Sequence, residues 1–207
     1  MSFYARERSS SSIRPISIRQ GLLTRDGSAS FKFVNGPAEV KIRDEKLDKA
    51  TIDVVVRPLV GTPGTKDKKH EYILRSIFES VIQSGLHPRT LIQIVSQVME
   101  DDGSILATSI NATTLALMDA GIPMKNVVTA VSCILDKNDE ILVDPTLQEM
   151  ENLQSAHTFA FDNTSSNLIF CDSSGIYSEE QYFNCYELCR AASFKVLAEI
   201  RDSVAKQ

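Results

Sequence analysis

Two spacings of apolar residues alternate along this chain. In the segment ATIDVVVRP, Ile52, Val54 and Val56 occupy every second position, which predicts a strand that ends at Pro58. Over residues 67–83 the apolar residues recur every three or four positions, which predicts an amphipathic helix. A chain that switches between these two spacings is typical of a layered fold of sheets and helices.

The same spacings predict the other elements. We expect strands in the segments GLLTRDGSASFKF (two strands around the turn Asp26-Gly27), TLIQIVSQVM, NVVTAVSCIL, EILVD, HTFAF and NLIFCD. A second helix is expected over NATTLALMDAG, where Gly121 and Pro123 are stop signals. A capping box at Ser178 opens a last helix that runs to about Val204. Its inward stripe is expected to contain Tyr182, Tyr186, Cys189 and Phe194. This order predicts an α/β (α+β) fold with mixed β-sheets packed by helices.

Charge and cysteine content narrow the classes of function. The 22 Lys and Arg residues are outnumbered by 27 Asp and Glu, so the chain has no global basic footprint for nucleic acid, and any such contact must be local or shared. The four cysteines form no CxxC pair and the three histidines do not cluster with them, so we expect reduced thiols, no metal site and no cofactor. No apolar run approaches the ~18 residues of a membrane span. We therefore expect an intracellular protein with no membrane partner.

The segment DDGSILATSINATTLALMDAGIPM contains the first candidate for chemistry. Asp102, Gly103 and Ser104 precede a helix, whose free N–H groups could hold an anion. No Lys or Arg lies nearby in the sequence to neutralise a phosphate. The alternative is a turn in which Asp102 caps the helix, with Ile110, Leu115 and Leu117 in the core.

The segment ILVDPTLQEME contains the second candidate. Asp144 follows a strand, and Glu149 and Glu151 come after it, so two carboxylates could hold a divalent metal or act as acid and base. The alternative is a turn, because Pro145 and Thr146 are residues that turns favour.

Several segments in order resemble RNase PH-like proteins, the phosphorolytic 3′-to-5′ exoribonucleases and their exosome relatives: GLLTRDGSASF, NGPAEVK, VVVRP, LRSIFESVI, LHPRT, DGSILATSINATTLALMDAGIPM, VDPT and GIYS. LHPRT, VDPT and GIYS are similar to one particular exosome ring subunit. The resemblance implies duplicated β-α-β units in a single domain over residues 14–207, preceded by a mobile tail over residues 1–13. That tail could be phosphorylated or simply solvated.

The resemblance also implies what the candidate residues do. Active members have Gly-Thr-Arg at the loop, where this chain has Gly103, Ser104 and Ile105, and a second Asp where it has Met150. Asp144 matches the first Asp, and Arg75 matches a further phosphate-site Arg. Gly103, Ser104 and Asp144 would then be vestigial, and the chain would be no enzyme. The alternative is an active phosphorolytic or metal-dependent exoribonuclease, and a third hypothesis is a free-standing scaffold.

A non-catalytic ring subunit implies particular partners. These are five other RNase PH-like ring subunits, OB-fold and KH-type cap subunits, and single-stranded RNA in the ring pore during RNA degradation and rRNA processing. Arg57, Arg75 and Arg89 are the candidates for RNA contact, and each could instead be an ordinary surface or packing arginine. The resemblance implies a location in nucleus, nucleolus and cytoplasm.

The N-terminal hairpin departs from the family. Only Lys32 to Asn35 separate Phe31 from Gly36, where relatives have a turn and another strand. The difference is either a lost sheet edge or an error in the gene model.

Overall fold

The structure is a computed structural model that describes residues 10, 11, 13, 28–29, 32–41, 43–99, 101–164 and 167–205. Most of the predicted mobile tail and the turn Asp26-Gly27 lie outside these residues. Within them, no helix is both long and apolar enough to cross a membrane.

The first half of the chain forms a four-stranded sheet in the order β1-β2-β4-β3. Its strands are β1 (Ser28–Ala29), β2 (Lys32–Glu39), β3 (Thr51–Arg57) and β4 (Thr90–Gln97). β3 and β4 are parallel and are joined through α1 (Thr65–Val81) and the short helix η1 (Ser84–Leu86), so they form a β-α-β unit. Within the described residues, β1 pairs with β2 through Ser28 and Ala29.

The second half forms another four-stranded sheet, in the order β6-β5-β7-β8. Its strands are β5 (Val128–Asp136), β6 (Ile141–Val143), β7 (Leu153–Asp162) and β8 (Leu168–Gly175). The short helix η2 (Glu149–Asn152) lies between β6 and β7. All neighbouring pairs in this sheet are antiparallel. The two halves of the chain therefore each contain a four-stranded sheet packed by helices. Among the described strands, parallel pairing occurs in the first sheet alone, so the β-α-β unit is found in the first half.

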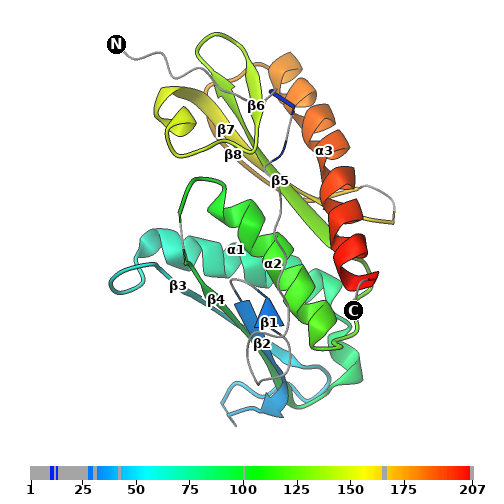
Figure 1. The fold of residues 1–207 in the computed structure, drawn as a ribbon. Coiled ribbons are helices and arrows are strands. Elements are labelled where there is room, and N and C mark those ends of the chain that lie inside the picture. The colour runs from blue at the N-terminus through cyan, green and yellow to red at the C-terminus, as the bar shows by residue number, and fades with distance from the viewer. Residues whose placement is uncertain are drawn as a thin grey trace.

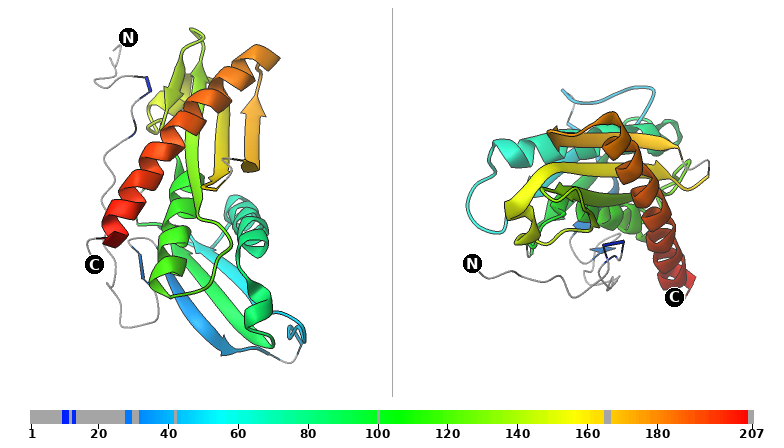
Figure 2. Two further views of the ribbon diagram at one scale, coloured as in Figure 1. Left: turned by 90° about the vertical axis from the view of Figure 1, so that its right-hand side faces the viewer. Right: turned by 90° about the horizontal axis from the view of Figure 1, so that it is seen from above.

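Helix α2 (Ile105–Asp119) leads from the first sheet to the second, and α3 (Glu179–Ala205) lies along the second sheet (Figures 1 and 2). β5 contacts both helices, and its residues from Val128 to Leu135 are all buried. A continuous apolar strand is the pattern expected when both faces of a sheet are covered. A single hydrophobic cluster joins residues of both halves, and it includes Ile110, Leu115 and Leu117 as predicted. That residues 14–207 form a single domain stays a prediction.

The element predictions that fall on described residues are confirmed in type, with two corrections. The strand expected after Asp26-Gly27 is divided, because Ala29 pairs antiparallel with Lys32, and the strand expected before that turn lies outside the described residues.

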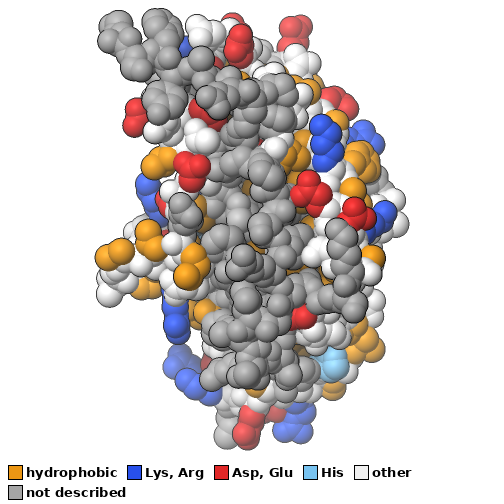
Figure 3. Space-filling model, in the orientation of Figure 1, with side chains coloured by type: hydrophobic (Ala, Val, Ile, Leu, Met, Phe, Trp, Pro, Cys, Tyr) orange, Lys and Arg blue, Asp and Glu red, His pale blue; other side chains and the backbone are white. Residues whose placement is uncertain are grey.

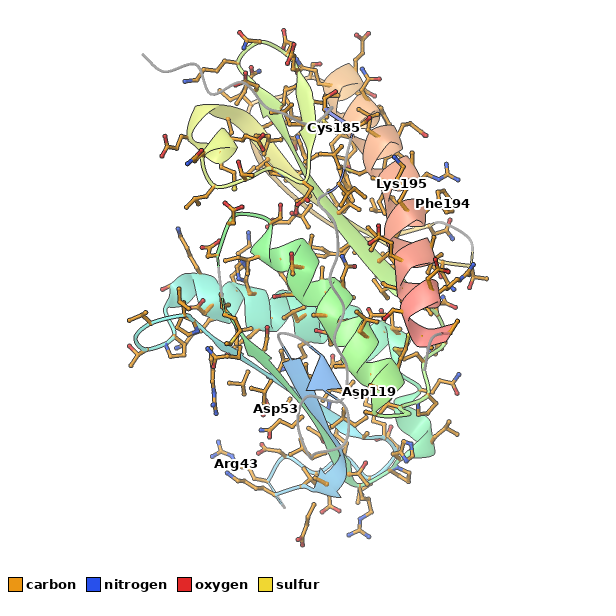
Figure 4. All side chains as sticks on the ribbon, in the orientation of Figure 1. Arg43, Asp53, Asp119, Cys185, Phe194 and Lys195 are labelled. Carbon is orange, nitrogen blue, oxygen red and sulfur yellow. The ribbon has the colours of Figure 1, made fainter. Side chains whose placement is uncertain are left out.

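The second correction is in α3. The capping box is present, because the Ser178 N–H donates to Gln181 Oε1 (2.7 Å) and the Gln181 N–H donates to Ser178 Oγ (3.3 Å). Phe194, however, is 50% exposed and points away from the sheet (Figure 4). The buried positions of α3 include Cys189, Ser193 and Val196, so Phe194 is rotated about 100° away from the buried stripe.

Candidate functional site

The two segments singled out for chemistry meet in space, although about 40 residues separate them. The Leu147 N–H donates to Asp102 Oδ1 (3.3 Å), and Ser104 Oγ donates to the Pro145 carbonyl oxygen (3.4 Å). A Cβ on Gly103 would lie 2.7 Å from that carbonyl oxygen and 3.2 Å from Met150 Sδ. The loop before α2 and the turn after β6 are therefore packed against each other.

The loop is a strained turn that leads directly into α2. Gly103 and Ser104 both have positive φ, of 79° and 54°, and the Gly103 N–H donates to Asp101 Oδ1 (3.1 Å). Only glycine fits at 103, because the backbone is left-handed there and the space is closed. The predicted helix cap at Asp102 is wrong. α2 begins at Ile105 with Ser104 as N-cap, and the Asp102 carboxylate instead accepts the hydrogen bond from Leu147.

The turn after β6 uses its polar groups locally. The Thr146 N–H donates to Glu149 Oε2 (2.8 Å), and the Glu149 N–H donates to Thr146 Oγ1 (3.4 Å). This reciprocal pair resembles a capping box at the start of a helical turn. Asp144 is half-buried with a φ of 54°, and its N–H donates to the Ser132 carbonyl oxygen (2.8 Å). Glu151 is exposed, and no group of three metal-binding side chains occurs among the described residues.

The three candidate arginines do not form one patch: Arg75 is on α1, and the other two lie at the ends of the β3–β4 pair. Arg57 is exposed at the end of β3, whereas Arg89 directly precedes β4. Because β3 and β4 are parallel and Arg57 is in register with Gln97, these two residues lie at opposite ends, roughly 25 Å apart. On the face seen in Figure 3, basic and acidic side chains are interspersed.

Two of the arginines are held by carboxylates. Arg75 Nη2 lies 3.2 Å from Oδ1 of Asp53, a residue of β3. Arg89 Nε donates to Glu45, and this hydrogen bond raises the pKa of Arg89. Neither charge is therefore available to a phosphate without competition from its carboxylate.

The sequence patterns missed a buried polar chain between β7 and β8. His157 Nε2 lies 3.0 Å from Ser155 Oγ, and its Nδ1 lies 2.9 Å from Ser173 Oγ. Burial lowers the pKa of His157, so the ring is held neutral. The signal was present in the sequence: His157 shares its strand face with Phe159 and Phe161, which are core residues.

The thiols lie mostly inside the protein. All four cysteines are free, and Cys133, Cys185 and Cys189 are buried. A hydrogen bond to Cys133 and burial raise the pKa of Cys185 far above its usual value, and a hydrogen bond to Cys171 raises the pKa of Tyr182 to about 12. Cys185 and Tyr182 therefore stay protonated at neutral pH, and a protonated thiol is unreactive.

The chain belongs to the RNase PH family of 3′ exoribonucleases. Residues 12–123 match domain 1 of that family and residues 126–192 match domain 2. The boundary between the matches falls between α2 and β5.

Several relatives are named as one exosome component. The fission yeast (Schizosaccharomyces pombe) exosome complex component rrp46 is 38% identical over 182 residues, with 82% of this chain and 80% of the relative covered. The rice exosome complex exonuclease RRP46 homolog is 31% identical, with 97% of this chain and 94% of the relative covered. These names confirm the resemblance that LHPRT, VDPT and GIYS indicated, which is to ribosomal RNA-processing protein 46.

The solved structures confirm the fold. Rice Rrp46 superimposes with a TM-score of 0.90 at 31% identity and covers 96% of this chain and 98% of its own. The Archaeoglobus fulgidus exosome with RNA bound to the active site gives a TM-score of 0.78, covers 93% of this chain and 90% of its own, and is 18% identical. The RNase PH-like prediction is therefore confirmed.

Proposed function

We propose that this chain is a non-catalytic ring subunit of the exosome that supports 3′-to-5′ RNA processing and degradation, including rRNA maturation. The proposal is supported by relatives that are named as exosome components and by a similar fold in an exosome core. Its partners are five other RNase PH-like subunits and OB-fold and KH-type caps, and it acts in nucleus, nucleolus and cytoplasm.

The observation that carries the non-catalytic role is that positions 105 and 150, where the loop before α2 meets the turn after β6, both have apolar side chains. The resemblance puts an Arg at Ile105 and an Asp at Met150. Ile105 is instead the first residue of α2, and the Met150 thioether packs against Gly103. A phosphate at this turn would meet no cation from position 105 and no carboxylate from position 150. Removing one preorganised group commonly slows a reaction about 100 to 1000-fold, and two are replaced here.

RNA in the ring pore is contacted through its phosphates in this proposal. Arg57 is the foremost candidate, because its side chain is exposed and Arg75 and Arg89 have carboxylate partners. The net charge of -5 means that the isolated chain should bind RNA weakly and lose it as the salt concentration rises.

Two measurements test the proposal. A tagged chain purified from cells of its own species should recover the five other RNase PH-like proteins and the caps; their absence contradicts the role in the ring. Purified protein incubated with labelled single-stranded RNA and phosphate should release no nucleoside diphosphates, and Ile105→Arg alone should not change this. Phosphorolysis by that single variant would show that the account of position 150 is wrong.

The rice relative's name includes the word exonuclease, which favours an active nuclease as the second candidate. Asp144 with Glu149 or Glu151 would have to act, and Glu149 already accepts a hydrogen bond within its turn. RNA shortening in phosphate, Mg²⁺ or Mn²⁺ that Asp144→Asn abolishes would support this candidate. Glu140→Gln is the matched control, because it removes an exposed carboxylate just before β6.

A further inference from the structure

The outer edge of β8 has main-chain N–H and C=O groups that form no hydrogen bond with the rest of the described chain. β8 is the last strand of the second sheet (Figure 2, left). The Ile176 N–H donates to the Gln154 carbonyl oxygen (3.2 Å), and Gly175 is in register with Ser155. Because inward and outward groups alternate in an antiparallel strand, the main chains of Cys171, Ser173 and Gly175 face outward. Within the described ranges, no hydrogen bond is recorded to these groups.

The other sheet edges differ from that of β8. Among the described residues, β1 pairs with two residues of β2, and α2 contacts both strands. On β3, the Val56 N–H donates to Glu71 Oε1 of α1 (2.9 Å). On β6, the Val143 N–H donates to the Ser10 carbonyl oxygen (2.9 Å). Proteins usually protect long edges with proline, lysine, bulges or a covering element. β8 has eight residues, none of which is proline or lysine, and its register shift against β7 lies near its start, between the pairs Ala160–Phe170 and Phe161–Leu168.

The surroundings of this edge define the chemistry of its partner. Apolar side chains lie at both ends of the strand, because Leu168 at its start is 37% exposed and Ile176 just after its end is 80% exposed. Glu179 and Glu180 follow at the exposed start of α3. The complement is an extended segment with apolar residues at the two ends and a Lys or Arg opposite the two glutamates.

We infer that the outer edge of β8 receives a strand from a neighbouring RNase PH-like subunit, so that the second sheet continues into that subunit. The inference rests on the proposed function, since it takes the neighbour from the ring. An added strand satisfies the main-chain groups of Cys171, Ser173 and Gly175 together, which a helix or a folded side-chain surface cannot do.

Amide hydrogen exchange of the unmodified chain tests the edge directly. In the isolated chain, the amides of Cys171 and Ser173 should exchange fast, whereas those of Asp172 and Ser174, which face β7, should be protected. In the ring assembled from the six RNase PH-like proteins, Cys171 and Ser173 should become at least 100-fold more protected. If the ring assembles and these two amides stay unprotected, the edge assignment is overturned while the proposed function stands. Protection that grows with the concentration of the isolated chain would show a second copy as occupant and also overturn it.

A matched pair of variants tests whether the edge is needed for assembly. Ser173→Pro removes an outward N–H, a change that edge strands tolerate. Ser173→Ala is the control, because both variants lose the hydroxyl that contacts His157. Ser173→Pro should enter the ring at least 10-fold less well than Ser173→Ala, as measured by competition with differently tagged unmodified chain. Equal incorporation contradicts the inference, and if Ser173→Pro fails to fold, the exchange measurement decides. Failure of the unmodified chain to recover any RNase PH-like partner would instead overturn the proposed function.

Discussion

The second sheet has two edges that differ. β6 is shorter than β5, and the main-chain groups of β5 that extend beyond it form hydrogen bonds with side chains of α2. The outward main-chain groups of β8, by contrast, have no hydrogen bond within the described part of the chain. Asn111 Nδ2 donates to the Ala130 carbonyl oxygen (2.8 Å), and the Ala130 N–H donates to Asn111 Oδ1 (2.7 Å). Thr114 Oγ1 donates to the Val128 carbonyl oxygen (2.9 Å). One edge of the second sheet is thus completed from within, and the other is left for a partner.

This difference explains two polar residues in the middle of a buried helix. Asn and Thr are weak helix formers, and α2 is buried on most of its sides. Asn111 and Thr114 serve the edge of β5 and have no part in the Gly103 loop. These hydrogen bonds fix α2 on the second sheet. The loop that leads into α2 can therefore keep its shape although Ile105 offers no group that binds phosphate.

The largest effect is expected for Asn111→Ala. It leaves both main-chain groups of Ala130 without their partner in a half-buried place, so the free energy of unfolding should fall by roughly 2–4 kcal/mol. Urea denaturation followed by circular dichroism measures the change.

Thr108→Ala is the matched control on the same helix, because Thr108 is exposed. It should change the free energy of unfolding by less than about 0.5 kcal/mol. If Asn111→Ala is no more destabilising than this control, the hydrogen bonds between Asn111 and Ala130 do not stabilise the edge of β5, and the two edges of the sheet do not differ in the way described.

Thr114→Val should have a smaller effect. The two side chains have nearly the same shape, so the change removes the hydroxyl and leaves the Val128 carbonyl oxygen unpaired. The free energy of unfolding should fall by about 1–2 kcal/mol. Hydrogen exchange should accelerate at the β5 end near Val128 and not at β8; acceleration across the whole sheet would mean that Thr114 acts on global packing.

The sequence predicted the elements well, because apolar spacing reports which face of a strand or helix is buried. It placed Ile110, Leu115 and Leu117 correctly in the core. It misplaced Phe194, since a stripe read from spacing alone is uncertain by one position, and one position is about 100° on a helix.

The site was predicted only in its parts. Local pattern identified the Gly103 loop and the Asp144 turn separately, but their packing through Pro145 and Met150 is a tertiary contact. Asp102 has the sequence position of a helix cap. Its carboxylate bonds the Leu147 N–H, a partner 45 residues away that no local rule can supply.

The polar chain that joins β7 to β8 gives a pH-dependent prediction. Burial lowers the pKa of His157 below its ordinary 6.5, so the folded state holds the neutral ring. Its contribution to stability is fully present above pH 6.5 and is lost as the pH falls through the lowered pKa. The free energy of unfolding should therefore decrease on acidification from pH 7.5 to 5.5, by less than the about 1.4 kcal/mol per pH unit that one proton allows.

Burial also lowers the pKa of His70, so His70 adds a pH dependence of its own. Comparing His157→Gln with the unmodified chain isolates the contribution of His157, because His70 is present in both. The variant should show a shallower loss of stability between pH 7.5 and 5.5 than the unmodified chain. Parallel curves would mean that His157 is protonated equally in the folded and unfolded states and does not hold β8 in its neutral form.

The smallest effect is expected for the ion pair that ties β8 to the first half of the chain. Lys69 Nζ on α1 lies 2.7 Å from Oδ2 of Asp172, and both side chains are partly exposed. An exposed pair of this kind contributes less than about 1 kcal/mol, and salt screens it. A double-mutant cycle with Lys69→Ala and Asp172→Ala should give a coupling in that range at low salt and nearly none at 1 M salt. A coupling above about 2 kcal/mol that persists in salt would mean that α1 holds β8 rigidly against the first half of the chain, although the outward main-chain groups of β8 would stay unbonded among the described residues.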